Sequence, residues 1–194
     1  MKRIFFLSLA LTTTASAVVA QSNLQAPPNL DAVVQNVLSS FEVPGISIAI
    51  VKNGKVVLAK GYGVRQLGQS KPVDEHTLFP IASNTKAFTA TALALLVQEG
   101  KIKWDDPVID HLPWFRMSDP FVTANMTIRD LLVHRSGLPA YAGDLLQFPP
   151  TDYSREAIVR KLKDIPLAAS FRSTYAYDNI LYLAAGEVIK AVSG

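Results

Sequence analysis

The sequence contains no cysteine among its 194 residues. Disulfide bonds, a cysteine nucleophile and a thiolate metal site are therefore excluded. The three histidines, His76, His111 and His134, do not have the i, i+4 spacing of two metal ligands on one helix face. The sequence therefore predicts neither a metal site nor a cofactor.

Charged residues are also scarce, at 18% of the chain, whereas 49% of the residues are hydrophobic. A chain of this composition can bury a core and is not typical of a disordered protein. The sequence has no long run of like charge, no internal repeat and no low-complexity tract. Its length fits one domain.

The first twenty residues have the pattern of a secretory signal peptide. Lys2 and Arg3 precede a short apolar run over residues 4–11, and small residues with two candidate cleavage sites follow up to residue 20. The run is too short for a membrane anchor, which must cross about 30 Å of hydrocarbon. We therefore predict a signal peptide over residues 1–20, a periplasmic or secreted protein, and no integral membrane span after the signal is removed.

Removal of this segment lowers the net charge from +3 to +1. The sequence therefore lacks the basic stripe that a nucleic-acid-binding protein needs, and we predict no nucleic-acid partner. Residues 21–28 are predicted to be a linker, and residues 29–194 the folded domain.

The domain begins with a predicted helix and hairpin. A helix is expected over residues 30–41, where six apolar residues form one stripe, with Asn29 or Asp31 as its cap. Two β-prone runs, residues 46–52 and 55–60, flank Asn53-Gly54, the strongest short hairpin signal. The stripe is formed by Leu30, Val33, Val34, Val37, Leu38 and Phe41.

Most of the remaining sequence is predicted to be helical. A helix over residues 84–98 is apolar nearly all round, which indicates burial, and Gly100 ends it. Thr127 and Asp130 resemble a capping box for a short helix, and Ser154 can cap a helix over 155–163. A last helix is expected over 179–190. The fold class is therefore α+β, with an antiparallel sheet whose hairpin needs further strands that this chain does not supply.

The first candidate for chemistry is the string Ser83-Asn84-Thr85-Lys86 at the start of the apolar helix. Ser83 and Lys86 are three residues apart and lie on one helix face. A serine hydroxyl is a weak nucleophile that needs a base, and a lysine amine can serve if burial lowers its pKa. The alternative is a serine N-cap followed by a surface lysine.

The second candidate is Tyr177-Asp178-Asn179, just before the last helix. A tyrosine with a lowered pKa can share the role of base with a lysine, and an asparagine amide can hold a substrate carbonyl or the lysine. The alternative is a core tyrosine followed by an asparagine helix cap.

Together these strings resemble the serine β-lactamase and penicillin-binding-protein superfamily, whose pattern is S-x-x-K followed by Y-x-N. The stretch over residues 126–139, Met-Thr-Ile-Arg-Asp-Leu-Leu-Val-His-Arg-Ser-Gly-Leu-Pro, is the most specific match, and the resemblance covers about residues 30–194. It implies a β-lactamase/transpeptidase-like fold, with a helical region packed on an antiparallel sheet. It also implies that the C-terminal strands and the third motif of the family are missing from this chain.

The resemblance assigns a role to each matching residue. Ser83 corresponds to the acylated nucleophile, and its backbone N–H to half of the oxyanion hole. Lys86 and Tyr177 correspond to the residues that deprotonate the serine, and Asn179 to the substrate-orienting amide. Asp178 stands where many relatives have a small residue, and it could stabilise Lys86 or face solvent. We expect His134 to be structural, because a histidine near a helix C-terminus is favoured by the helix dipole.

The implied function is that of an exported serine hydrolase. It would act through an acyl-serine intermediate on an ester, a D-amino-acid peptide or a β-lactam, and its partner would be a small-molecule or peptidoglycan-like acyl substrate. The alternative is a catalytically incomplete fragment or a non-catalytic protein that binds cell-wall peptides.

Overall fold

The computed structural model describes residues 25–194, and the chain divides into two compact units. The first unit ends at Phe79 and the second covers Pro80–Gly194. The predicted signal peptide, and residues 21–24 of the predicted linker, lie outside the described residues.

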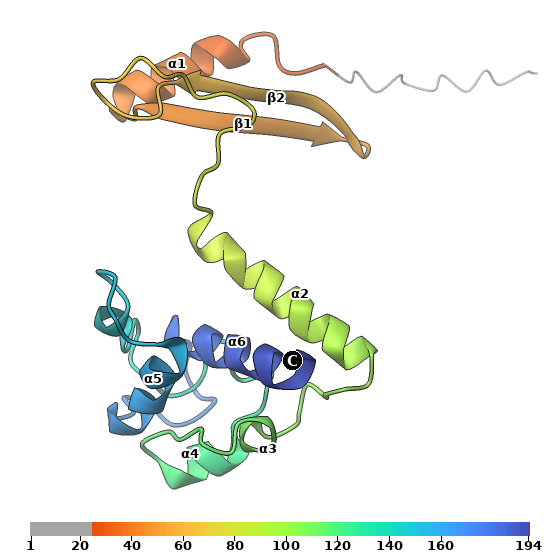
Figure 1. Ribbon diagram of the computed structural model, residues 1–194, viewed down its shortest axis with the longest axis vertical. Helices are drawn as coiled ribbons and strands as arrows, with labels where there is room; N and C mark the ends of the chain where they lie inside the picture. Colours follow the sequence, from red (N-terminus) through yellow and green to blue (C-terminus); the bar gives the residue numbers. More distant parts are fainter. Residues whose placement is uncertain (1–24) are drawn as a thin grey trace, which may run out of the picture. The chain divides into compact units, whose positions relative to one another are not determined.

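The first unit consists of one helix on one hairpin (Figure 1). Helix α1, Leu30–Ser40, buries Val34 and Leu38 against Tyr62 of the hairpin. The predicted stripe is therefore buried only in part, since Val33 and Phe41 are exposed. The predicted caps were wrong, because neither side chain caps α1: Asn29 makes no cap hydrogen bond, and Asp31 accepts instead from Lys60 and Tyr62.

The hairpin confirms the sequence prediction. Strand β1, Gly45–Lys52, pairs antiparallel with strand β2, Lys55–Gly63. Asn53 and Gly54 between them have φ angles of 52° and 72°, the positive values that a type I′ turn requires. This two-stranded sheet, together with the helices, is consistent with the predicted α+β class.

The second unit is helical. Its helix α6 lies beside α2 and α5 (Figure 1), and together they bury a single apolar core. The elements are the 3₁₀ turn η1 (Ala82–Asn84), α2 (Thr85–Gln98), α3 (Val108–His111), α4 (Pro120–Asn125), η2 (Asp144–Leu146), α5 (Arg155–Arg160), η3 (Lys161–Asp164) and α6 (Ile180–Ser193). Among the helices of residues 25–194, none combines the length and the hydrophobicity needed to cross a bilayer.

Two sequence predictions about the ends of helices in this unit are confirmed. Ser154 caps α5 by accepting from the backbone N–H of Ala157 at 3.1 Å, and Gly100 follows α2 with a φ of 70°. Both features depend on side-chain or backbone chemistry within four residues, which a sequence pattern can capture.

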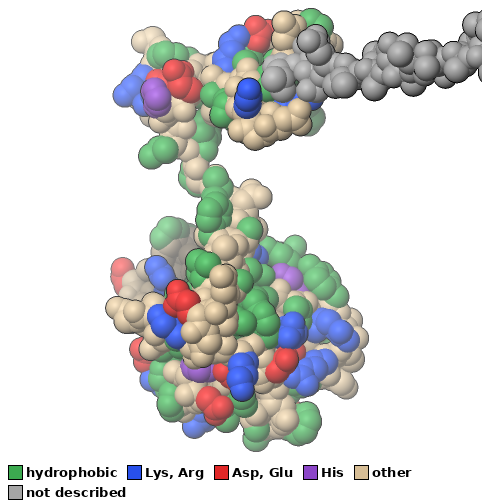
Figure 2. Space-filling view, turned by 90° about the vertical axis from the view of Figure 1, so that its right-hand side faces the viewer, with side chains coloured by type: hydrophobic (Ala, Val, Ile, Leu, Met, Phe, Trp, Pro, Cys, Tyr) green, Lys and Arg blue, Asp and Glu red, His purple; other side chains and the backbone are tan. Residues whose placement is uncertain are grey.

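Two other predictions were wrong. Helix α2 is not buried all round: Leu93 and Leu96 are buried, but Phe88 and Leu95 are exposed, and hydrophobic side chains are visible on the surface of this unit (Figure 2). Within its unit, α2 packs mainly on α6, so only one side is covered.

The short helix predicted at Thr127 is a series of turns. The capping-box contacts do form, since Asp130 accepts from the backbone N–H and the hydroxyl of Thr127 at 2.9 and 2.7 Å. The following bonds are of mixed i+4 and i+3 type, and His134 has a φ of 57°, which stops any helix after one turn.

Candidate active site

Ser83 lies in the 3₁₀ turn that leads into α2, with its side chain exposed. The alternative that it caps the helix is not supported, because Asn84 occupies the N-cap position and no side chain makes a cap bond there. Ala82, just before it, has a φ of 44°, a left-handed conformation that costs a non-glycine residue roughly 1–3 kcal/mol. Such strain next to an exposed serine is typical of a functional turn.

Lys86 points back at this serine from the first turn of α2. Its Nζ donates to Ser83 Oγ at 3.1 Å and to Asn179 Oδ1 at 2.6 Å. The ammonium also lies 4.7 Å from the ring centroid of Tyr177 and 5.1 Å from that of Tyr182. The lysine is therefore half-buried among polar and aromatic partners, and the alternative of a free surface lysine is not supported.

Tyr177 completes the contacts of the serine. Its hydroxyl donates to Ser83 Oγ at 2.7 Å. The pKa of the phenol is lowered below its ordinary value, first by the side chain of Lys86 and then by the hydrogen bond with Ser83. Ser83 Oγ thus accepts from two donors at once, which is the environment that stabilises an alkoxide. The donor that can give up its proton and become the base is the tyrosine with the lowered pKa.

Asn179 occupies the N-cap position of α6 but does not cap it with its side chain. Its carbonyl oxygen accepts from Lys86, while its NH₂ group donates to both oxygens of Asp144 at 3.1 and 3.0 Å. The structure therefore brings together all four residues predicted from the sequence, Ser83, Lys86, Tyr177 and Asn179, within one unit.

Three further residues lie at this site, of which the sequence had singled out only His134. His134 is buried and its ring lies 4.5 Å from that of Tyr177, tilted by 33°. Tyr182 donates to the backbone oxygen of Leu132 and presents its ring to Lys86. Asp144 holds the amide of Asn179. Of the two residues that the sequence had not singled out, only Tyr182 had a usable signal, because it lies three residues after Asn179.

His134 supports Tyr177 and is not placed to act as a base on Ser83. Its Nδ1 accepts from the backbone N–H of Asp178 at 3.3 Å, and burial lowers the pKa of the imidazole, with Lys86 adding to the effect. A neutral ring that accepts one backbone bond fits beneath the tyrosine without adding charge. The structural role expected from the sequence therefore agrees, but the reason given for it was wrong. Residues 128–134 form turns, not a helix, and the lowered pKa favours the neutral imidazole.

Two alternatives were expected for Asp178, that it stabilises Lys86 or that it faces solvent, and the second was wrong. It does not face solvent: it is fully buried, with Oδ1 accepting from the backbone N–H of Leu181 at 3.2 Å and Oδ2 without a hydrogen-bond partner. Burial raises the pKa of this carboxyl to about 6, against the attraction of Lys86. Its neighbours in the sequence, Tyr177 and Asn179, contact Ser83 and Lys86 instead.

A titration prediction follows from this burial. In the unfolded chain the carboxyl has a pKa of about 3.9, so ionisation at pH above 7 destabilises the fold by up to about 3 kcal/mol. The folded state binds the extra proton between the two pKa values, so the wild-type chain gains stability as the pH falls from about 7 to about 4. Asp178→Asn keeps an oxygen for Leu181 and removes the charge, and we expect it to be the more stable chain at pH 7.5.

Thermal unfolding at two pH values checks this prediction. The advantage of Asp178→Asn should be large at pH 7.5 and fall to about a third of that free energy at pH 4.5. Asp164→Asn, at an exposed position, is the control. An equal difference in melting temperature at both pH values would contradict the prediction.

A cavity of about 650 Å³ lies beside the serine. It is of the size expected of a small-molecule site and combines apolar walls with a few polar groups. Its lining residues are Pro80, Ala82, Ser83, Thr85, Lys86, Thr89, Gln147, Phe148, Arg155, Asn179, Tyr182, Leu183 and Gly186. Ser83, Lys86 and Asn179 therefore face a space that an acyl substrate can enter.

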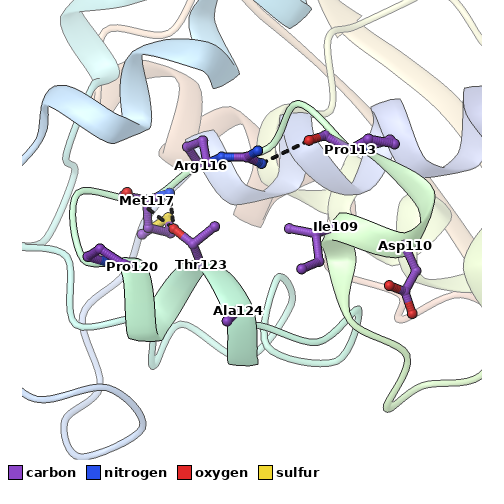
Figure 3. A pocket seen from close by; sticks show the side chains of 8 residues that line it. All are labelled: Ile109, Asp110, Pro113, Arg116, Met117, Pro120, Thr123 and Ala124. Carbon is purple, nitrogen blue, oxygen red and sulfur yellow. Dashed lines mark hydrogen bonds between the residues drawn. The ribbon is translucent and has the colours of Figure 1, made fainter.

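A second cavity, of about 480 Å³, lies between α3 and α4 (Figure 3). Its one strong cation, Arg116, donates to the backbone oxygens of Pro113 and Phe115, and the hydroxyl of Thr123 is bonded to the backbone of Met117. These groups are engaged by the backbone and include no nucleophile beside a base. Within residues 25–194 no cluster of three or more metal-binding side chains occurs.

Comparison with known proteins identifies the family. The beta-lactamase family model matches residues 30–194. The chain is 34% identical over 167 residues to the unguisins hydrolase ungD of Aspergillus violaceofuscus, which covers 83% of this chain and 29% of that protein. This chain belongs to the beta-lactamase family and has its β-lactamase/transpeptidase-like fold.

Two solved structures resemble the chain along most of its length. The octameric penicillin-binding protein homologue from Pyrococcus abyssi is 32% identical, with a TM-score of 0.72, over 86% of this chain and 39% of its own. The D-amino acid amidase from Ochrobactrum anthropi is 30% identical, with a TM-score of 0.67, over 82% of this chain and 44% of its own. The chain thus spans less than half the length of these relatives.

Proposed function

We propose that this chain carries the nucleophilic half of an exported serine hydrolase that works through an acyl-serine intermediate. The observation that carries the proposal is the pair of hydrogen bonds to Ser83 Oγ, from Lys86 Nζ at 3.1 Å and from the Tyr177 hydroxyl at 2.7 Å. A serine held by two groups that can carry its proton has the arrangement needed for nucleophilic catalysis.

In the proposed reaction, Tyr177 first releases its proton to solvent, which its lowered pKa favours. The phenolate then takes the hydroxyl proton of Ser83 while Oγ attacks the substrate carbonyl. The ammonium of Lys86 stabilises the developing negative charge. After the acyl–oxygen bond has formed, the bond between the carbonyl carbon and the leaving group breaks, and Tyr177 gives the leaving group the proton that it took from Ser83. The phenolate of Tyr177 then deprotonates a water molecule, which attacks the acyl carbonyl. The bond between the acyl carbon and Ser83 Oγ breaks, and Oγ takes back the proton from Tyr177.

The proposed substrate is a small ester, a D-amino-acid peptide or a β-lactam, with preference for the first two. Relatives described as a D-amino acid amidase, a penicillin-binding protein homologue and an unguisins hydrolase support an acyl compound as substrate. The cavity of about 650 Å³ beside Ser83 supports a compound of this size. The proposed location, periplasmic or secreted, depends on the signal-peptide pattern of residues 1–20.

Identification of the acylated residue tests the proposal. The complete chain is incubated with a fluorescent penicillin and, separately, with a fluorophosphonate, then digested and analysed by mass spectrometry. We expect the fluorophosphonate adduct on the peptide that contains Ser83, and the penicillin comparison indicates whether β-lactams are accepted. A folded chain that carries no adduct, or carries it on another residue, would favour the alternative of a non-catalytic binding protein.

A further inference from the structure

Asp144 is a charged group at the active site that the reaction outlined above does not use. It belongs to η2, and its two carboxylate oxygens accept from the side-chain NH₂ of Asn179 at 3.1 and 3.0 Å. On the other side of the same amide, the carbonyl oxygen accepts from Lys86 Nζ at 2.6 Å. The amide thus bridges a carboxylate and an ammonium.

The two charges dictate which way the amide points. A flipped amide would direct its NH₂ group at the ammonium of Lys86 and its oxygen at the carboxylate of Asp144, and both contacts would be repulsive. Lys86 alone could be satisfied by other acceptors and leave Asn179 free to rotate. With Asp144 present, only one orientation forms both charge-assisted bonds, and it holds Lys86 Nζ within 3.1 Å of Ser83 Oγ.

The backbone around Asp144 is built to hold it in place. The backbone N–H of Tyr141 donates to the backbone oxygen of Tyr177 at 2.7 Å, which ties this loop to the tyrosine beside the serine. Gly143 has a φ of 76°, and a Cβ there would lie 2.9 Å from Cδ1 of Ile180 in α6. The residue before Asp144 therefore lies close against α6, and a backbone hydrogen bond ties the same loop to Tyr177.

We propose that Asp144 is a positioning residue for acylation: it fixes the amide of Asn179, which in turn holds Lys86 on Ser83. This inference rests on the proposed acyl-serine function. Asp144 does not touch the serine, so its effect must pass through Asn179. Two consequences distinguish this from a purely structural role: Asn179 must be present for Asp144 to matter, and a side chain with one oxygen at position 144 must restore part of the effect.

The rate at which a fluorophosphonate labels Ser83 in the complete chain tests the proposal. Asp144→Ala should slow labelling by about 100-fold, the loss typical of a misplaced catalytic group. Asp144→Asn keeps one oxygen for the amide and should recover to within about 10-fold of the wild-type rate. The exposed Asp152, in the segment that follows η2, provides the matched control, and Asp152→Ala should label at the wild-type rate.

A double-mutant cycle shows whether the effect passes through Asn179. Asn179→Ala should itself be slow, and the Asp144→Ala/Asn179→Ala double variant should be no slower than Asn179→Ala alone. Additive losses would overturn the proposal. Labelling of Asp144→Ala at the wild-type rate would also overturn it. If Ser83→Ala did not label in the same experiment, the proposed function would still stand.

A second measurement does not depend on turnover. In a chain with ¹⁵N-labelled asparagine, the side-chain NH₂ signal that disappears in Asn179→Ala belongs to Asn179. Its protons should exchange with solvent more slowly in the wild-type chain than in Asp144→Ala, with Asp144→Asn between them. Equal exchange in all three folded chains would overturn the positioning role, even if the wild-type chain proved unable to label and the proposed function failed.

Discussion

Replacing Ser83 with alanine is expected to reduce covalent labelling by a fluorophosphonate to background. The variant lacks the oxygen that receives hydrogen bonds from both Lys86 and Tyr177, at 3.1 and 2.7 Å. Neither partner can replace it, because the adduct requires an Oγ at this position and the bases only move protons. In-gel fluorescence over a time course measures the loss.

The fold should survive this change, since Ser83 is exposed and caps no helix. Circular dichroism and the melting temperature should therefore match those of the wild-type chain. Ser170→Ala, at another exposed serine, is the control and should label normally. Undiminished labelling of Ser83→Ala would show that the nucleophile lies elsewhere.

Replacing Lys86 with methionine is expected to slow labelling by about 10²–10⁴-fold, the range for loss of a group that assists proton transfer. Methionine has a similar length but cannot donate to Ser83 or to Asn179. The change also removes the main cause of the lowered pKa of Tyr177. Because the base must be deprotonated to act, the rate should then begin to rise only at a higher pH than in the wild-type chain.

The pH profile of labelling separates this effect from simple damage. Lys86→Met should shift the acid limb of the profile to higher pH, and Lys86→Arg, which keeps a positive charge near the tyrosine, should shift it less. Lys163→Met, at an exposed lysine of η3, is the control and should leave rate and profile unchanged. A Lys86→Met chain with the wild-type rate and profile would exclude a role for this lysine in acylation.

Sequence patterns predicted the local structure well where the governing contacts are short-range. The Asn53-Gly54 turn, the cap at Ser154 and the left-handed Gly100 are all decided within a few residues. The missed elements, α3 and α4, are helices of four and six residues, which are too short to show a helical period in the sequence. A local signal for α4 was available, because Asp119 caps it and Pro120 follows in its first turn. At Thr127 the capping contacts formed but the helix did not.

Helix α2 shows what a hydrophobic pattern in the sequence cannot predict. Its composition predicted burial all round, yet Phe88 and Leu95 of α2 are exposed while Leu93 and Leu96 pack inside. A hydrophobic pattern reports what a helix can bury, and the neighbours available in space decide which faces are covered.

The sequence by itself determined the four site residues and the pairing of Ser83 with Lys86, because residues three apart on a helix face the same way. Only the tertiary structure decided that Tyr177 and Asn179, more than ninety residues later, close on that pair. The tertiary structure alone also decided that Asp178 is buried and that Asp144 lies next to the side-chain amide of Asn179. No local rule fixes contacts across such separations, since they depend on how α6 packs against α2, and that packing is a property of the whole core.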